Sequence, residues 1–257
     1  MKTHLVFASL FAVTVLQAAD APSAQDLASK LADAVNDGAS TARLKMDIMP
    51  APGQKTVLQL KANALRTAEN SSVHYQVLWP KDRTAGSFVL RKPAGGAASG
   101  SVLQTDGSIK PISQTLDAAF DSDISYEDLA GNYFAWEKQT LTGEETVKGI
   151  PCVILESKPG SKDRSAYGSV RTWIDPKRVV PLRVEKINSN GQLVRRITIT
   201  LVSKDDQGRT IPANFAIERP GQESRTVIEG SNIKHDVSLS AADFSAEVLK
   251  PKPAPGQ

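Results

Sequence analysis

The chain has 257 residues, a formal net charge of +3, 40% hydrophobic residues and one cysteine. So small a charge balance, spread over the whole chain, excludes the strongly basic surface typical of a nucleic-acid-binding protein. One cysteine excludes a disulfide within the chain, and the apolar residues after Cys152 predict a buried, inert thiol.

The first 21 residues are typical of a secretory signal peptide. Lys2 and His4 precede an almost unbroken apolar run at residues 5–16, and small residues lead to a favoured cleavage point after Ala21. The run is too short to cross a bilayer as a mature helix, so export with cleavage is favoured over a membrane anchor. We therefore expect a signal peptide at 1–21, one domain at 22–249 and a disordered, proline-rich tail at 250–257.

The first predicted element of the mature chain is an amphipathic helix at Ala24–Val35. Leu27, Leu31 and Val35 recur at helical spacing, Ser23 is a plausible N-cap, and residues 36–38 (Asn-Asp-Gly) supply a stop. Such a helix either plugs the core permanently or serves as a lid over a cavity, and the pattern is compatible with both.

From Thr41 onward the hydrophobic period changes from helical to alternating, which is typical of strands. Asp106-Gly107 and the Asn-Ser-Asn-Gly run at 188–191 are hairpin signals, and the small residues at 94–100 predict a flexible loop. The pattern predicts about ten to twelve antiparallel strands, among them residues 44–48, 58–62, 73–79, 87–91, 134–142, 152–158, 169–174, 181–187, Leu193–Lys204, 211–219, 223–229 and 233–237.

An acidic block at residues 121–129 interrupts the strands. A helical turn at 115–120 leads into it, and Ser125 with Asp128 forms a capping-box signal for a short helix. The block lacks the spacing of a calcium-binding loop. We therefore interpret its carboxylates as the solvated start of a helix, favoured by the helix dipole, rather than as an acid/base pair. A last helical turn is expected at 240–244.

The sequence contains no recognisable catalytic constellation. His74 and His235 are the only histidines after the predicted signal peptide, and neither has a Cys or His neighbour at metal-ligand spacing. Nucleophile elbows, phosphate-binding loops and dinucleotide fingerprints are also missing from it. We therefore expect a protein that is not an enzyme and that has no catalytic residue, cofactor or metal site.

Several motifs, in their order along the chain, resemble the LolA-like outer-membrane lipoprotein-sorting family. The resemblance covers roughly residues 58–244, whereas residues 94–114 depart from the usual pattern. The matching motifs are Ser122-Asp123-Ile124-Ser125-Tyr126-Glu127-Asp128-Leu129, Gly149-Ile150-Pro151-Cys152, Trp173-Ile174-Asp175 and Pro181-Leu182-Arg183-Val184-Glu185. The resemblance implies a mainly β fold with few helices, in which a strongly curved antiparallel sheet forms an unclosed half-barrel covered by helices.

The same resemblance implies a periplasmic carrier that holds acyl chains of a lipoprotein or lipid in an apolar concavity and sorts them towards the outer membrane. Its partners would then include an inner-membrane donor and an outer-membrane acceptor. The strands also offer more apolar surface than the predicted helices at 24–35 and 241–244 can fill. Burial stabilises an acyl chain by about 0.8 kcal/mol per methylene, so binding of such a chain in an unfilled hollow would be favourable.

Six aromatic residues are candidates for the cavity wall, each with ordinary core packing as the alternative: Trp79, Phe88, Phe134, Trp136, Trp173 and Phe215. A different class of function is also open, namely an envelope sensor or protein-interaction module built on the same half-barrel. A filled concavity with an exposed edge strand would favour that second class, and a full-length apolar hollow would favour the carrier.

Overall fold

The computed structural model describes residues 22–81 and 83–250. The predicted signal peptide and residues 251–257 of the predicted tail lie outside the described residues. Within this part of the chain, none of the helices has the length and apolarity needed to cross a membrane.

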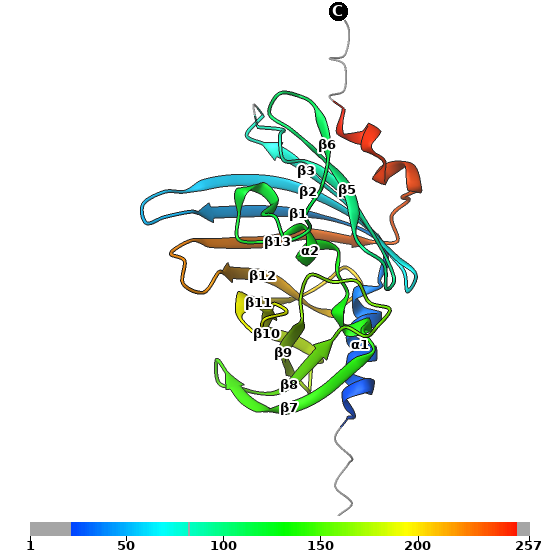
Figure 1. Cartoon of the computed structure of the whole chain (residues 1–257), viewed down its shortest axis with the longest axis vertical. Helices are drawn as coiled ribbons and strands as arrows, with labels where there is room; N and C mark the ends of the chain where they lie inside the picture. The colour runs from blue at the N-terminus through cyan, green and yellow to red at the C-terminus, as the bar shows by residue number, and fades with distance from the viewer. Residues whose placement is uncertain (1–21, 82, 251–257) are drawn as a thin grey trace, which may run out of the picture.

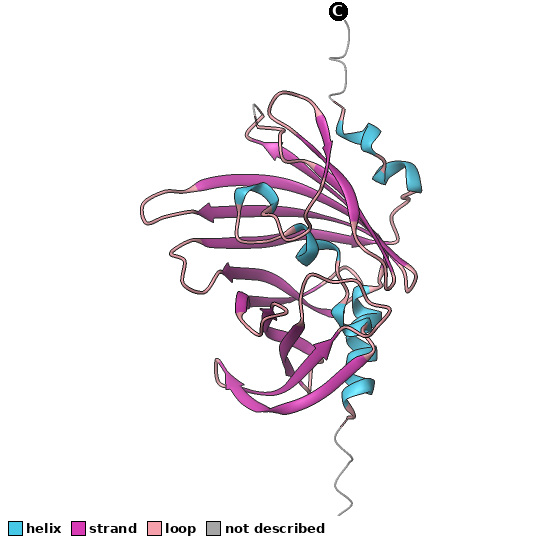
Figure 2. Ribbon diagram, in the orientation of Figure 1, coloured by secondary structure: helices cyan, strands magenta, loops and turns pink. Residues whose placement is uncertain are grey.

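Thirteen strands form one antiparallel sheet in the order β6-β5-β4-β3-β2-β1-β13-β12-β11-β10-β9-β8-β7. The sheet is long, curved and open, with few helices around it (Figures 1 and 2). This confirms the expected half-barrel. The strands are β1 Gly38–Met49, β2 Thr56–Arg66, β3 Asn70–Trp79, β4 Phe88–Pro93, β5 Ser99–Leu103, β6 Ile109–Pro111, β7 Lys138–Val147, β8 Ile150–Lys158, β9 Ser169–Asp175, β10 Val180–Ile187, β11 Leu193–Lys204, β12 Thr210–Glu218 and β13 Arg225–His235.

Two meanders, β1–β6 and β7–β13, are joined where β1 pairs with β13. The two edge strands of the sheet, β6 and β7, are therefore consecutive along the chain. Residues 112–137 connect them and must travel from one edge to the other; we call them the crossing segment. Figure 1 shows this segment, with its short helix, lying across the sheet.

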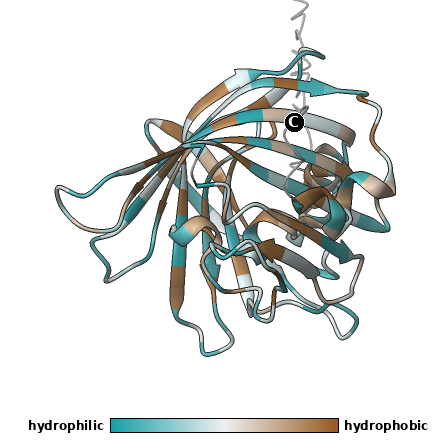
Figure 3. Ribbon diagram, turned by 90° about the horizontal axis from the view of Figure 1, so that it is seen from above, coloured by the Kyte–Doolittle hydropathy of each residue, from teal (hydrophilic) through white to brown (hydrophobic). Residues whose placement is uncertain are grey.

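Side chains alternate between the two faces of each strand, and hydrophobic and hydrophilic residues alternate visibly along the ribbons (Figure 3). β-bulges, such as those between Leu141 and Gly143 and between Pro181 and Arg183, add local bend and twist. The concave face carries the main core of the first meander, in which Leu60, Val77 and Phe88 are fully or almost fully buried.

The predicted first helix is confirmed as α1, Ala24–Val35. Ser23 caps it by accepting a hydrogen bond from the Asp26 amide, as expected. Its apolar stripe packs Leu27 and Leu31 against Leu155 and Ile174 of the sheet. The helix therefore covers the concave face of the second meander.

The remaining helices are short: α2 Tyr126–Ala130 and the 3₁₀ turns η1 Ala119–Asp121, η2 Tyr133–Ala135, η3 Ala241–Phe244 and η4 Ala246–Leu249. α2 begins with the predicted capping box of Ser125 and Asp128. The C-terminal turns do not fill the hollow. Leu249 packs against Val89 and Leu103, and Val89 points to the face opposite its neighbour Phe88.

Some predicted boundaries are wrong. The strand predicted at 134–142 starts only at Lys138, because Phe134 lies in η2 and packs under α1. The separate strand predicted at 233–237 is the end of one continuous β13. The loop predicted at 94–100 gives way to β5 at Ser99. The described residues thus contain thirteen strands instead of ten to twelve.

Candidate binding site on the concave face

The crossing segment fills much of the hollow of the first meander. Its residues Phe120 and Tyr126 lie against Phe88 of β4, with ring centroids 5.3 and 4.9 Å apart. Phe120 adopts a left-handed backbone (φ 61°), which turns the chain into the acidic block. The apolar face of β1–β4 is thus covered by the protein's own aromatic rings.

Asp123 anchors this segment to the sheet. Its carboxylate accepts hydrogen bonds from Ser224 Oγ (2.5 Å), Thr226 Oγ1 (2.8 Å) and Arg219 Nε (2.9 Å). Its backbone carbonyl accepts a further bond from Arg195 Nε. Asp123 is almost completely buried, so each partner offsets part of the cost of taking its charge out of water.

Asp128 forms a second anchor beside the first. Arg195 Nη1 lies 2.9 Å from Asp128 Oδ2, and the Tyr167 hydroxyl donates to Asp128 Oδ1 at 2.9 Å. Lys186 Nζ lies 3.9 Å from the same Oδ1. Lys186 also lies over the Tyr133 ring at 3.9 Å. Burial, reinforced by Arg195 and opposed by Asp128, lowers the pKa of Lys186 to about 8. Burial and the Asp128 charge raise the pKa of Tyr167.

These contacts correct the interpretation of the acidic block as a solvated helix start. Asp123, Glu127 and Asp128 are buried and paired, whereas Asp121 is exposed and pairs with Arg83 at 3.0 Å. Glu127 lies 3.6 Å from Lys92 Nζ. The block holds the crossing segment in place with charge, and its cationic partners lie far away in sequence.

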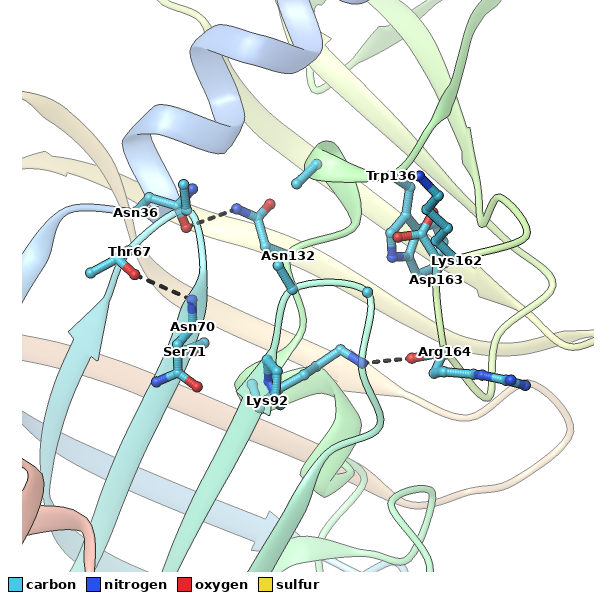
Figure 4. Close-up of a pocket in the computed structure, with 16 residues that line it drawn as sticks. Asn36, Thr67, Asn70, Ser71, Lys92, Asn132, Trp136, Lys162, Asp163 and Arg164 are labelled. Carbon is cyan, nitrogen blue, oxygen red and sulfur yellow. Dashed lines mark hydrogen bonds between the residues drawn. The ribbon is translucent and has the colours of Figure 1, made fainter.

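A pocket opens at the mouth of the hollow; we call it the mouth pocket (Figure 4). Its volume is about 340 Å³. Its walls come from the end of α1, the β2–β3 turn, the β4–β5 turn, the crossing segment and the β8–β9 loop. Its polar and aromatic lining includes Asn36, Thr67, Asn70, Ser71, Lys92, Asn132, Trp136, Lys162, Asp163 and Arg164.

One rim of the mouth pocket joins the two halves of the sheet, and we call this contact the rim bridge. The Arg164 amide donates to the Gly95 carbonyl at 2.8 Å. Lys92 Nζ donates to the carbonyl oxygens of Arg164 at 2.6 Å and Gly96 at 3.0 Å. Gly95 (φ 67°) approaches so closely that an added Cβ would lie 2.9 Å from the Lys162 carbonyl oxygen.

The predicted wall residues are spread over the sheet. Phe88 is buried under the crossing segment, and Phe215 packs beside the same cluster. Phe134 lies under α1, and Trp136 lines the mouth pocket. Trp79 is 48% exposed at the end of β3.

The sixth, Trp173, belongs to a different cluster. It follows Val170 and Thr172 in β9 and precedes Ile174, which packs against α1, so Trp173 points to the opposite face. Its indole donates to Glu145 at 2.8 Å, and Arg183 lies over its ring at 4.7 Å. Only Phe88 and Phe215 of the six share a cluster.

His235, set aside from sequence spacing alone, lies near three carboxylates. Its Nδ1 is 2.5 Å from Asp206 Oδ1 and 3.9 Å from Asp205 Oδ2, and its Nε2 is 3.0 Å from Asp37 Oδ2. Arg209 Nε already donates to Asp205 Oδ2 at 2.7 Å. The cluster is a polar junction between the start of β1 and the β11–β12 turn, and it includes the Arg209–Asp205 ion pair.

The family is decided by comparison with known sequences. The sequence model of a family described as "Uncharacterized protein" matches residues 103–251, more than half of the chain. The chain belongs to this family. No curated protein matches the sequence. The family match includes the acidic block, the rim bridge's β8–β9 side and every strand of the second meander.

Solved structures show the fold of this family member. A DUF1329 family protein from Desulfovibrio piger has a TM-score of 0.79 at 24% identity, covering 88% of this chain and 97% of that one. A putative outer membrane lipoprotein-sorting protein domain from Vibrio parahaemolyticus has a TM-score of 0.76 at 20% identity, covering 88% and 98%. A LolA superfamily protein from Nitrosomonas europaea has a TM-score of 0.70 at 16% identity, covering 89% and 100%. The fold is therefore LolA-like, as the sequence motifs imply.

Proposed function

We propose that this protein is a non-enzymatic periplasmic carrier that binds acyl chains of a lipoprotein or lipid on its concave face. The observation that carries the proposal is the unclosed half-barrel, whose apolar concavity is covered by two separate segments, α1 and the crossing segment. The LolA-like fold and the name of the Vibrio parahaemolyticus structure support it.

The two covers differ in how firmly they are held. α1 buries two leucines and two alanines against the second meander, roughly 4–6 kcal/mol of apolar contact. The crossing segment adds the buried ion pairs of Asp123 and Asp128 to its aromatic contacts. A long acyl chain supplies on the order of 10 kcal/mol, so it is able to displace α1 while the crossing segment stays.

Displacement of α1 places the cargo beside specific residues. Phe134, Leu155 and Ile174 lose their cover when the helix moves, and Trp136 lies next to them at the mouth. Of the candidate wall residues, we propose Phe134 and Trp136 as the first to meet an acyl chain. Transfer from an inner-membrane donor to an outer-membrane acceptor completes the proposed sorting role.

The test is acyl binding by delipidated protein. The full chain is expressed with export, and material from the periplasm is analysed by native mass spectrometry and then delipidated and titrated with a fluorescent fatty-acyl probe. We expect co-purified acyl species, saturable binding and competition by palmitate. A delipidated protein that binds no acyl probe would falsify the carrier proposal.

A second candidate, an interaction module, is favoured by the exposed edge strand β7. Its outer edge pairs with no other strand of the described sheet, and Leu141 on it is exposed. Such an edge is able to accept a partner's strand. Leu141→Lys discriminates the two: it should abolish binding of a protein partner through the edge but leave acyl-probe affinity unchanged.

A further inference from the structure

Two residues that line the mouth pocket each carry a buried polar atom with no hydrogen-bond partner among the described residues. These atoms are Ser71 Oγ and Asn132 Oδ1. Ser71 is 9% exposed and sits at the start of β3, and Asn132 lies in the crossing segment between α2 and η2. An unpaired buried polar group costs about 1–3 kcal/mol, so both atoms favour a ligand that satisfies them.

Asn132 is held in a definite orientation. Its Nδ2 donates to Asn36 Oδ1 at 3.2 Å and to the Ala32 carbonyl at 3.3 Å, both at the end of α1. Figure 4 shows the Asn132–Asn36 bond at the pocket wall. Because the amide nitrogen is committed to the helix, its oxygen remains as an acceptor. The ligand must therefore offer a hydrogen-bond donor, and Ser71 is able to pair with a donor or an acceptor.

The hydrogen-bonding groups nearest Asn132 favour a donor over an anionic ligand. Lys92 directs its ammonium towards the carbonyl oxygens of Gly96 and Arg164 and lies 3.6 Å from Glu127. The lining also includes Lys162 and Asp163, one charge of each sign. In Figure 4 the Arg164 side chain extends away from Lys92 and Asn132. A phosphate would find the Lys92 ammonium already partnered, and its oxygens would be repelled by the acceptor Asn132 Oδ1, which no described residue pairs.

We propose that the mouth pocket binds an uncharged head group that donates hydrogen bonds from hydroxyl or amide N–H groups. This inference rests on the proposed carrier function, since the head group would be the polar part of the acylated cargo. The volume of about 340 Å³ suits a small group, because ligand pockets start near ~300 Å³. Glyceryl hydroxyls and the amide of an acylated peptide both have this chemistry.

The experiment compares four palmitoyl ligands on delipidated full chain by calorimetric titration: monopalmitoylglycerol, N-palmitoylglycinamide, palmitate and palmitoyl lysophosphatidate. Each is titrated into wild type, Ser71→Ala and Ser40→Ala. Ser40 is a similarly buried serine that lines a different pocket. Ser71→Ala removes a buried hydroxyl that has no partner among the described residues, so we expect a melting temperature equal to or above that of wild type.

We expect Ser71→Ala to weaken glyceride or amide binding about fivefold, the effect of one hydrogen bond, with palmitate affinity unchanged. Loss in the glyceride arm alone identifies a glyceryl group, and loss in the amide arm alone identifies a peptide amide. Ser40→Ala should match wild type in every arm.

Three results would overturn the inference. If palmitate binds but Ser71→Ala changes neither neutral ligand, or changes them no more than Ser40→Ala, the pocket proposal fails and the carrier proposal stands. If lysophosphatidate binds tightest and independently of Ser71, the head group is anionic. If no acyl ligand binds wild type, both proposals fall together.

Discussion

At the scale of single residues, this fold depends on buried charge. Asp123 is bound by Ser224 and Thr226, at the start of β13, and by Arg219, whose own side chain is partly exposed. Replacing a carboxylate that accepts several short hydrogen bonds lowers stability strongly, because its partners are then left buried and unpaired.

Asp123→Asn tests this anchor. The amide has almost the same shape but places N–H donors against donors, so we expect a loss of roughly 3 kcal/mol in the free energy of unfolding. Asp121→Asn, two positions away on an exposed side chain, should change it by less than about 0.5 kcal/mol. Urea unfolding of both variants decides the matter, and equal effects would contradict a special role for Asp123.

Lys186 makes the stability of the fold depend on pH in the alkaline range. Its pKa is lowered to about 8 by burial, whereas the unfolded chain keeps this ammonium protonated up to about pH 10.5. Between these values the unfolded state binds more protons, so this group's contribution to stability rises with pH, by up to about 1.4 kcal/mol per pH unit. Lys186→Met removes the titration. In urea unfolding, the free energy of unfolding of wild type should therefore rise relative to that of the variant from pH 8 to 10. A difference between the two free energies that does not change with pH would count against the lowered pKa.

At the scale of elements, α1 and the crossing segment divide the hollow between them. α1 lies on the second meander by an apolar stripe, and its C-terminal end is tied to the crossing segment through Asn132. The crossing segment is tied to strands of both meanders, through Lys92 on β4 and Arg195 on β11. The helix is thus held by fewer charged contacts than the crossing segment.

Leu31→Ala decides whether α1 is a lid or a permanent plug. Truncation of this buried leucine should lower the free energy of unfolding by about 3 kcal/mol. If acyl binding requires the helix to move, the same change should tighten acyl-probe binding, by up to about 100-fold. Lys30→Ala, on the exposed side of the helix, should change neither quantity. Lost stability without tighter binding would identify α1 as a plug.

At the scale of the whole molecule, the curvature brings the β4–β5 turn of one meander to the β8–β9 loop of the other. The rim bridge at Gly95 and Arg164 joins two regions about 70 residues apart in sequence. This contact closes one side of the mouth pocket and leaves the half-barrel open elsewhere. At this rim the two halves are therefore held together by one backbone hydrogen bond and by the Lys92 ammonium.

Gly95→Ala should break the rim bridge. Alanine at a positive φ costs about 1–2 kcal/mol, and here its Cβ would also press on the Lys162 carbonyl oxygen. Gly53→Ala is the matched control, since Gly53 also has a positive φ but nothing within 4 Å of an added Cβ. We expect the larger loss for Gly95→Ala, with faster amide exchange at residues 92–96 and 160–166 only in that variant. Equal loss and equal exchange would show that the bridge does not hold the rim.

Much of the secondary structure could be predicted because its causes are local. Alternating apolar residues define β11 at Leu193–Lys204, the cap at Ser23 starts α1, and Ser125 with Asp128 starts α2. The motif order also indicated the half-barrel. Predictions failed where packing replaced local preference, as at Phe134, which has the composition of a strand but packs in a 3₁₀ turn under α1.

The candidate site was beyond local pattern, because its parts meet only in the folded chain. The carboxylates of the acidic block looked solvated, since their partners Arg195, Thr226 and Lys92 lie far away in sequence. Ser71 and Asn132 lie in no recognisable sequence motif, and only the folded chain brings five separate segments together as one pocket around them. The sequence by itself determined the strands, the first helix and the curved class of sheet, because side-chain period and turn chemistry are written locally. Only the tertiary structure decided which face is filled, which charges are buried and where a ligand has room, because these depend on pairings across the whole sheet.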